Sequence, residues 1–329
     1  MKDILGIEIG NKTVKFAEFR RGTLRNFVCV NVPDNAVMND VLVAFEAMGD
    51  LIKETVKANR ISVRKAALVL PQTDVYLRRL LIPAMNEKQL MVNMPYEFKD
   101  VLNMDKDKYI YDYSVIDYVK DEEGNVKEMD ILGAVVSSEL IDKYVEMFKR
   151  AGLKLVKAVP RELALSALSN FLNEHNENKD FAILDLGYKT SKVDIFKNGT
   201  YEITTTIDTG GEAVETAVAD LLGIDVHLAG QYVEMNKDDI LSNEKVVDVF
   251  SSAATEIMRV MNYYAFENPE STLDTLYYCG GASLMERFIK EIGEYVNLEL
   301  KPLASLSEST DDDEAVTKGA AAVGICIDE

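Results

Sequence analysis

The sequence predicts a mixed α/β protein with two lobes, in which each lobe begins with a β-meander and a small α+β subdomain is inserted into the first. Three observations predict this architecture. The chain has 329 residues, 47% of them hydrophobic, which is enough for more than one hydrophobic core. Strand-like alternation and helical periodicity both occur along it. A strand–turn–strand pattern that opens the chain returns in its second half.

Alternating apolar and polar residues near the N-terminus predict the first meander. The expected strands are 4–10, 14–19 and 24–32. Apolar side chains then recur at helical spacing over 39–58, and an apolar run at 65–70 predicts a strand that ends before Pro71. These elements form the expected core of the first lobe, residues 1–84.

Residues 85–160 are expected to form the inserted subdomain, because the pattern changes after Pro83. The expected elements are a helix over 87–104 interrupted by Pro95, strands over 109–118 and 127–136, and a helix over 138–150 capped by Ser138. Core packing is expected to explain most of the apolar residues Met85, Met91, Met94, Met104, Tyr96 and Phe98. Methionine-rich surfaces also suit peptide recognition.

The second lobe is expected over 161–329, where the N-terminal pattern returns. The expected strands are 181–187, 191–196 and 201–207, with a hairpin turn at Asn198-Gly199. A short strand at 276–279 and a helix over 314–324 follow, and this last helix is expected to return to the first lobe.

The two copies of the repeat suggest a phosphate site. Residues 7–15 and 184–192 both read apolar, acid, apolar, Gly, x, Lys, Thr, x, Lys. The acid two residues before the glycine lies on the same strand face as the glycine. Glycine is expected to permit positive φ in the turn and close approach of the backbone to a ligand, whose phosphate oxygens would meet backbone N–H groups. The acid can hold Mg²⁺ through water. One copy alone would indicate an ordinary hairpin; two facing copies could clamp a triphosphate.

Two glycine pairs support the same interpretation. Gly210-Gly211 precedes a predicted helix, where glycines favour the approach of an anion to the helix N-terminus. Gly280-Gly281 follows a predicted strand, where the backbone could lie against a nucleoside. Each pair alone would indicate a tight strand-to-helix turn.

Composition narrows the functional classes. The net charge of −20, from 56 acidic and 36 basic residues, disfavours binding to nucleic acid and to anionic membranes. Cys29, Cys279 and Cys326 form no CxxC pair, so buried, reduced thiols in a reducing compartment are expected. Asp3 and Glu8 exclude a signal peptide, and no apolar run is long enough to span a bilayer. Direct membrane insertion is therefore not expected.

Other polar residues carry weaker signals. The run Asp311 to Glu314 could hold a metal, but a solvated loop that supports the next helix N-terminus is the better explanation. His175 and His227 are expected at the surface.

The order of these motifs resembles the actin/Hsp70/sugar-kinase ATPase superfamily, and within it PilM-like type IV pilus assembly proteins, almost end to end. The segments "LGIEIGNKTVKFAEF", "AILDLGYKTSKVDIFKNG", "IDTGGEAV" and "LYYCGGASLM" carry the resemblance. The stretch "IPAM…YEF…YDYSVID" is its specific part. It falls in a subdomain that PilM-like and FtsA-like proteins carry and actin lacks.

The resemblance implies an actin-like ATPase fold and roles for individual residues. Phosphate contacts would come from Gly10, Asn11, Lys12, Thr13 and Lys15, and from Gly187, Lys189 and Thr190 on the other side. Glu8 and Asp185 would orient Mg²⁺ through water. Gly210, Gly211 and Glu212 would lie by the ribose of ATP, and Gly280, Gly281, Ala282 and Ser283 by the nucleoside.

Two departures from the family pattern concern nucleotide affinity. The first acid is Glu8, where relatives carry the shorter Asp. Residues 229–233 read Ala-Gly-Gln-Tyr-Val, where relatives carry Ala-Glu-x-x-Lys to grip the nucleoside, so an acid and a lysine are missing. No convincing water-activating residue is found. At most a slow ATPase is expected, and binding without turnover stays open.

The resemblance also implies a function. The protein would be a cytoplasmic component of the type IV pilus assembly platform, recruited to the inner face of the cytoplasmic membrane. It would bind the N-terminal segment of a PilN-like inner-membrane protein beside the inserted subdomain, contact other platform proteins, and form a homo-oligomer or ring. An FtsA-like cell-division protein, a sugar or acetate kinase and a nucleotide-free scaffold are the alternatives. The absence of a C-terminal amphipathic helix argues against the first. The second would need a catalytic acid near the substrate cleft and usually a larger substrate lobe, and a phosphotransfer assay with sugars and carboxylates would decide it.

Overall fold

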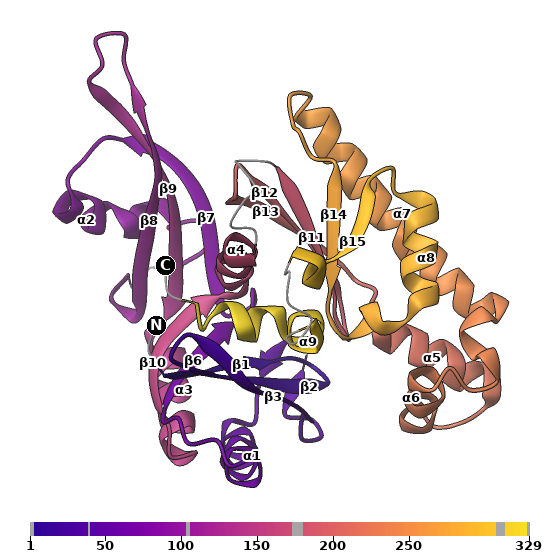
Figure 1. Ribbon diagram of the computed structural model, residues 1–329. Helices are drawn as coiled ribbons and strands as arrows, with labels where there is room; N and C mark the ends of the chain where they lie inside the picture. The colour runs from indigo at the N-terminus through magenta and orange to yellow at the C-terminus, as the bar shows by residue number, and fades with distance from the viewer. Residues whose placement is uncertain (1–2, 39, 103–105, 173–179, 307–312, 328–329) are drawn as a thin grey trace. The chain divides into compact units, whose positions relative to one another are not determined.

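The computed structural model describes residues 3–38, 40–102, 106–172, 180–306 and 313–327 (Figure 1). The chain forms two compact units. One contains Met1–Val32 and Glu162–Glu329, and the other contains Pro33–Arg161. Within the described residues, no helix is both long enough and apolar enough to cross a membrane.

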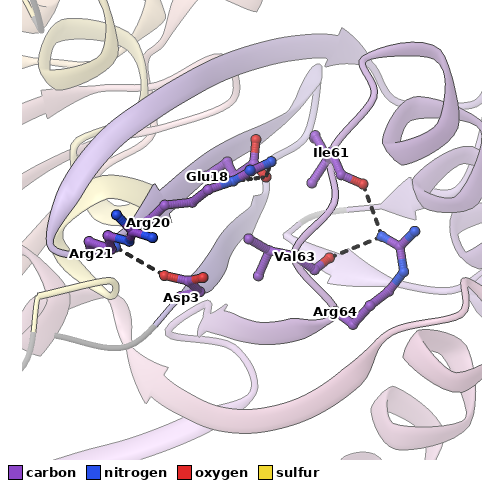
Figure 2. Close-up of polar contacts among 7 residues, drawn as sticks. All are labelled: Asp3, Glu18, Arg20, Arg21, Ile61, Val63 and Arg64. Carbon is purple, nitrogen blue, oxygen red and sulfur yellow. Dashed lines mark hydrogen bonds and ion pairs between the residues drawn. The ribbon is translucent and has the colours of Figure 1, made fainter.

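The first unit begins with the predicted meander. Strands β1 (Ile4–Ile9), β2 (Thr13–Arg20) and β3 (Thr23–Asn31) pair antiparallel, with Glu8 opposite Lys15. Arg20 donates to Glu18, and the backbone N–H of Arg21 donates to Asp3 (Figure 2). Residues of β3 alternate between exposed and half-buried, so Cys29 is exposed, and the prediction of a buried thiol is wrong at this position. Cys279 and Cys326 are buried as predicted.

A second, mixed sheet follows in the same unit. Its strands are β11 (Phe181–Leu186), β12 (Ser191–Lys197), β13 (Thr200–Ile207), β14 (Thr275–Cys279) and β15 (Glu299–Pro302). The order is β13-β12-β11-β14-β15, with β11 and β14 parallel. The predicted second meander is thus confirmed, because β11, β12 and β13 pair antiparallel in turn.

Helices of the first unit bury one core against this sheet. They are α5 (Gly211–Leu222), α6 (Val226–Glu234), α7 (Glu244–Glu267) and α8 (Glu286–Tyr295). Helices α7 and α8 run side by side, and Phe250 stacks on Phe288 between them (Figure 1). Residues 237–242 form a 3-10 turn, η2 (Lys237–Ser242). Helix α5 ends at Gly223, whose φ of 64° lies in the left-handed region.

Helix α9 (Asp313–Gly324) packs against β1, β2 and β14. Glycines make this close packing sterically feasible. A Cβ on Gly6 of β1 would lie 2.1 Å from the carbonyl oxygen of Ala322. A Cβ on Gly324 would lie 1.9 Å from the carbonyl oxygen of Ala164 in α4 (Arg161–Leu172). Asp313 and Glu314 begin α9, whereas Asp311, Asp312 and His175 lie outside the described residues.

The second unit contains a three-stranded antiparallel sheet in the order β7-β9-β8. Its strands are β7 (Val75–Pro83), β8 (Tyr109–Lys120) and β9 (Val126–Ser137), and the β8–β9 turn extends beyond α2 (Glu87–Glu97) (Figure 1). Helix α2 covers one face, where Met94 and Phe98 lie against Gly133 of β9. The predicted helix over 87–104 is therefore shorter, with Pro95 in its last turn; residues 103–105, including Met104, lie outside the described residues.

The rest of the second unit joins short strands and two helices. Its elements are β4 (Val37–Met38), β5 (Val41–Leu42), α1 (Phe45–Ala58), β6 (Lys65–Leu70), η1 (Lys106–Lys108), α3 (Ser138–Arg150) and β10 (Lys154–Pro160). Strands β6 and β10 are parallel. Arg64 donates to the carbonyl oxygens of Ile61 and Val63, which fixes the loop before β6 (Figure 2).

Two further sequence predictions for this unit are corrected. The helix predicted over 39–58 begins only at Phe45, because strands β4 and β5 pair antiparallel before it, and Asp40 between them has a φ of 63°. The cap of α3 is Ser137, whose side chain accepts from the backbone N–H of Leu140. Ser138 instead donates its hydroxyl to the carbonyl oxygen of Lys108.

Candidate functional site

All the residues predicted to bind nucleotide lie in the first unit. They come from the β1–β2 turn, the β11–β12 turn, the start of α5 and the segment after β14. The last of these segments is the 3-10 turn η3 (Gly281–Leu284). The site can therefore be described within one unit.

The first hairpin holds a largely buried ion pair. The backbone N–H of Gly10 donates to the carbonyl oxygen of Thr13 at 3.0 Å, which closes the turn. Lys15 Nζ lies 2.7 Å from Glu8 Oε1, and the two side chains are 14% and 16% exposed. Burial lowers the pKa of Lys15, but the charges of Glu8 and Asp185 outweigh burial, so the pKa is raised. Lys15 is thus a fixed cation beside the turn, as a phosphate contact requires.

The second hairpin has the same strand register as the first, with different neighbours. Asp185 lies opposite Lys192, and the hydroxyl of Ser191 donates to the carbonyl oxygen of Thr209 at 2.6 Å. Lys189 Nζ lies 3.0 Å from Glu212 Oε2, and both of these side chains are exposed. Lys189 and Glu212, assigned to phosphate and ribose by the resemblance, therefore contact each other.

Space explains the glycines of both hairpins. In residues 10–13 and 187–190, all of which the structure describes, no residue has a positive φ, so the predicted left-handed turn is wrong. A Cβ on Gly187 would lie 2.6 Å from the carbonyl oxygen of Thr190, and one on Gly10 would lie 3.1 Å from that of Thr13. The glycines let each turn fold tightly against its own second strand.

The first glycine pair serves packing of α5 on the second hairpin. The N–H of Gly211 donates to the carbonyl oxygen of Gly187 at 3.1 Å, and that of Glu212 donates to Tyr188 at 2.8 Å. A Cβ on Gly210 would lie 2.5 Å from the Tyr188 carbonyl oxygen. Two N–H groups at this helix N-terminus are therefore already hydrogen-bonded within the protein. An anion that approached this helix N-terminus, as predicted, could therefore not use these two N–H donors.

The second glycine pair lies against β11. Gly280 has a φ of 92°, and a Cβ there would lie 2.4 Å from the carbonyl oxygen of Leu186 and 2.5 Å from Asp185 Oδ1. Its N–H donates to the carbonyl oxygen of Thr317 in α9. Ser283 donates its hydroxyl to the Gly280 carbonyl oxygen at 2.7 Å, and Ala282 is buried. Only glycine fits here, because both the backbone angle and the space exclude a side chain.

The structure brings the two glycine pairs together. A Cβ on Gly211 would lie 3.8 Å from the Cβ of Ala282, which is ordinary van der Waals contact. Gly281 has open space around its Cβ position. The segments predicted to border ribose and nucleoside are therefore neighbours in the fold.

Two residues that the sequence did not single out belong to this cluster, Glu215 and Tyr188. Lys12 forms an ion pair with Glu215 Oε1, and the Tyr188 hydroxyl donates to Glu215 Oε2 at 3.0 Å. Lys12 Nζ also lies 4.9 Å from the centre of the Tyr188 ring. Burial and then the Glu215 charge raise the pKa of Tyr188, so its hydroxyl keeps its proton. The spacing places Glu215 one helical turn after Gly211, but no local pattern marks it as the partner of Lys12.

The carboxylates suit Mg²⁺ chemically. Glu8 and Asp185 supply hard oxygen donors next to the two hairpins, which suits a metal held through water. Among the side chains that the structure describes, no group of three or more His, Cys, Asp or Glu could hold a metal directly. Two carboxylates could thus hold a metal only together with phosphate or water ligands.

Matching hairpins open two mixed α/β modules, and the glycine-lined strand ends of these modules meet in one unit. This arrangement defines the actin-like ATPase fold class. Solved structures of this class are similar to the chain. The EutJ protein of Carboxydothermus hydrogenoformans matches with a TM-score of 0.60 and 15% identity, covering 97% of this chain and 88% of that one. MreB5 of Spiroplasma citri bound to ADP matches with a TM-score of 0.55 and 13% identity, covering 99% and 96%.

A third structure, described as a PilM–PilN type IV pilus biogenesis complex, matches with a TM-score of 0.83 and 19% identity, covering 98% of this chain and 97% of that one. The family model for type IV pilus assembly protein PilM matches residues 6–319. The chain belongs to this family.

Proposed function

We propose that this protein acts in the cytoplasm as an actin-like component of the type IV pilus assembly platform, recruited to the inner face of the cytoplasmic membrane by a PilN-like partner. The observation that carries the proposal is the family match over residues 6–319. Similarity over 98% of the chain to a relative described as a PilM–PilN complex supports the partner. Contact with other platform proteins and assembly into a homo-oligomer or ring are part of the same proposal.

The partner's N-terminal segment is proposed to bind beside the inserted subdomain. Within the second unit, α2 buries Met94 and Phe98 but exposes Met91, Val92 and Tyr96, which are 42%, 66% and 58% exposed. An exposed apolar helix face of this kind suits a short amphipathic segment. The methionines thus divide between the core and a candidate contact surface.

A PilN-type N-terminal peptide with a fluorescent label tests this surface. Tyr96→Ser should weaken peptide binding at least about tenfold if the ring is a buried anchor of the complex. Phe266→Ser is the matched control, because Phe266 is an exposed aromatic residue, 80% exposed, in the first unit. Equal affinities of all three proteins would exclude α2 as the contact surface, and no binding at all would exclude the partner.

ATP with Mg²⁺ is the proposed ligand of the first unit. The contact residues proposed are those of the two hairpins, Gly210 to Glu212 and Gly280 to Ser283, with Glu8 and Asp185 near the metal. The meeting of these segments in one unit supports the proposal, as does the ADP bound to the similar MreB5 structure.

The boundaries 1–84, 85–160 and 161–329 are proposed as lobe and subdomain limits. Nucleotide state would bias partner binding, and equal partner affinity with ATP, ADP and no nucleotide would contradict this coupling.

Calorimetric titration with Mg·ATP tests the ligand. Lys15→Ala and Asp185→Ala should each weaken binding about tenfold or more, because the first removes a cation proposed to contact phosphate and the second a carboxylate proposed to orient Mg²⁺. No heat from the parent protein would remove the nucleotide proposal and leave the family assignment standing. A nucleotide-free scaffold is then the remaining candidate. The hydrogen bonds already made by the N–H groups of Gly211 and Glu212 favour that alternative.

A further inference from the structure

A buried carboxylate holds one of the lysines proposed to bind phosphate. Lys12 forms an ion pair with Glu215 Oε1; the Lys12 side chain is 43% exposed and that of Glu215 is 8% exposed. The second oxygen of Glu215 accepts the hydrogen bond from Tyr188. Lys12 comes from the first hairpin, whereas Tyr188 belongs to the second and Glu215 to α5. The ion pair and the Tyr188 hydrogen bond thus connect the two hairpins through Glu215 of α5.

Gly230 provides the space for this carboxylate. A Cβ on Gly230 of α6 would lie 3.2 Å from the carboxylate carbon and 3.2 Å from each of its oxygens. Such a contact is tight, so any side chain at this position would crowd Glu215. The carboxylate therefore occupies the space that a side chain at position 230 would enter, and its charge is balanced by Lys12.

A phosphate ligand would compete with Glu215 for Lys12. The ammonium of Lys12 has three N–H donors, but a phosphate oxygen that binds it takes over part of the positive charge that balances Glu215. Without Lys12, Glu215 would keep the hydrogen bond from Tyr188 and remain a buried charge, which is unfavourable. Ligand binding at Lys12 is therefore opposed by the loss of this pair.

We propose that Glu215 sets the affinity of the site for nucleoside di- and triphosphates, because their phosphate must displace Glu215 from Lys12. The inference rests on the proposed nucleotide binding. The ion-paired state is the less competent one, so the apparent affinity of the protein rises with the fraction of molecules in which Lys12 is released. A substitution that removes the charge at position 215 releases Lys12 in every molecule.

Calorimetry with ADP and Mg²⁺ on four proteins tests this role: the parent, Glu215→Gln, Lys12→Gln and the double variant. Glutamine keeps the shape of Glu215 and can still accept from Tyr188. Glu215→Gln should bind ADP about tenfold more tightly than the parent. In the Lys12→Gln background, the same change should alter the dissociation constant less than about twofold, because no lysine remains to be released.

Glu18→Gln is the matched control. Glu18 is also a buried glutamate, 4% exposed, and it pairs at 2.8 Å with Arg20, which is 41% exposed (Figure 2). It lies on β2 outside the candidate site, so its substitution should leave the dissociation constant for ADP unchanged. If Glu215→Gln does not fold, Glu215→Asp replaces it, since the shorter side chain withdraws the carboxylate from Lys12 and should also tighten binding.

The outcomes separate the two proposals. Tighter binding by Glu215→Gln, or binding by this variant when the parent shows none, supports the role of Glu215. Equal binding by parent and variant overturns that role and leaves nucleotide binding intact. A gain that persists in the Lys12→Gln background also overturns it, because general repulsion by the carboxylate would then be the cause. No heat from any of the proteins overturns nucleotide binding, and the inference with it.

Discussion

The two hairpins of the first unit share one sequence pattern and place the same lysine in different surroundings. Lys12 and Lys189 hold equivalent positions, and their side chains are 43% and 40% exposed. Lys12 pairs with Glu215, which is 8% exposed, whereas Lys189 pairs with Glu212, which is 39% exposed. Both acids lie in the first turns of α5.

The difference shows that the local sequence pattern determines where the turn forms, whereas the tertiary partner determines how much the lysine contributes to stability. An exposed pair adds little to stability, because water and salt screen it. A pair with one buried member matters more, since loss of the exposed member leaves a buried charge. The two glycines also have different surroundings, because the turn at Gly187 is tighter than the turn at Gly10. Variants at equivalent positions can test each difference.

The largest difference is expected for the glycines. Gly187→Ala should lower the free energy of unfolding by about 3 kcal/mol, because a Cβ 2.6 Å from a backbone oxygen forces the turn to move. Gly10→Ala should lower it by about 1 kcal/mol, since its closest contact would be 3.1 Å. Urea denaturation followed by circular dichroism measures both. Equal losses would contradict the claim that the second turn is tighter.

The lysines should show a smaller difference. Lys12→Ala should lower the free energy of unfolding by about 2 kcal/mol, because Glu215 stays buried without its ion pair. Lys189→Ala should cost less than about 1 kcal/mol, because its partner is exposed. The same urea titrations measure both variants. A loss for Lys189→Ala as large as that for Lys12→Ala would remove the distinction between the two pairs.

Local sequence patterns are sufficient to predict the strands of both hairpins and the positions of their turns. Alternation and the acid–x–Gly spacing depend on neighbouring residues, and β1, β2, β11 and β12 lie where these patterns place them. The start of α1 was placed too early because apolar residues of the β4–β5 hairpin fit helical spacing by chance.

The tertiary contacts of the candidate site could not be predicted in this way. Glu215 lies 203 positions from Lys12 in the chain, and on its own it reads as an ordinary acidic residue of a helix. The glycines were predicted correctly as special positions, but for the wrong reason at Gly10 and Gly187, because the crowding atoms only become known once the turn is built. Nucleotide contacts by these residues stay predictions.

The smallest expected effect concerns the last lysine of each repeat, Lys15 and Lys192. The pKa of Lys15 is raised above its ordinary value of 10.5 in the folded protein, after burial and the opposing charges of Glu8 and Asp185 are combined. A lysine whose pKa is higher in the folded protein than in the unfolded chain contributes to stability. This contribution is fully present below the unfolded-state pKa and is lost as pH rises through the folded-state pKa. The parent should therefore lose stability as pH rises above about 10.5, and Lys15→Met should lack this part of the alkaline loss. Urea titrations at a series of alkaline pH values measure it, with Lys192→Met as the control from the second hairpin. If Lys192→Met removed the alkaline loss and Lys15→Met did not, the buried pair of the first hairpin would not be its source.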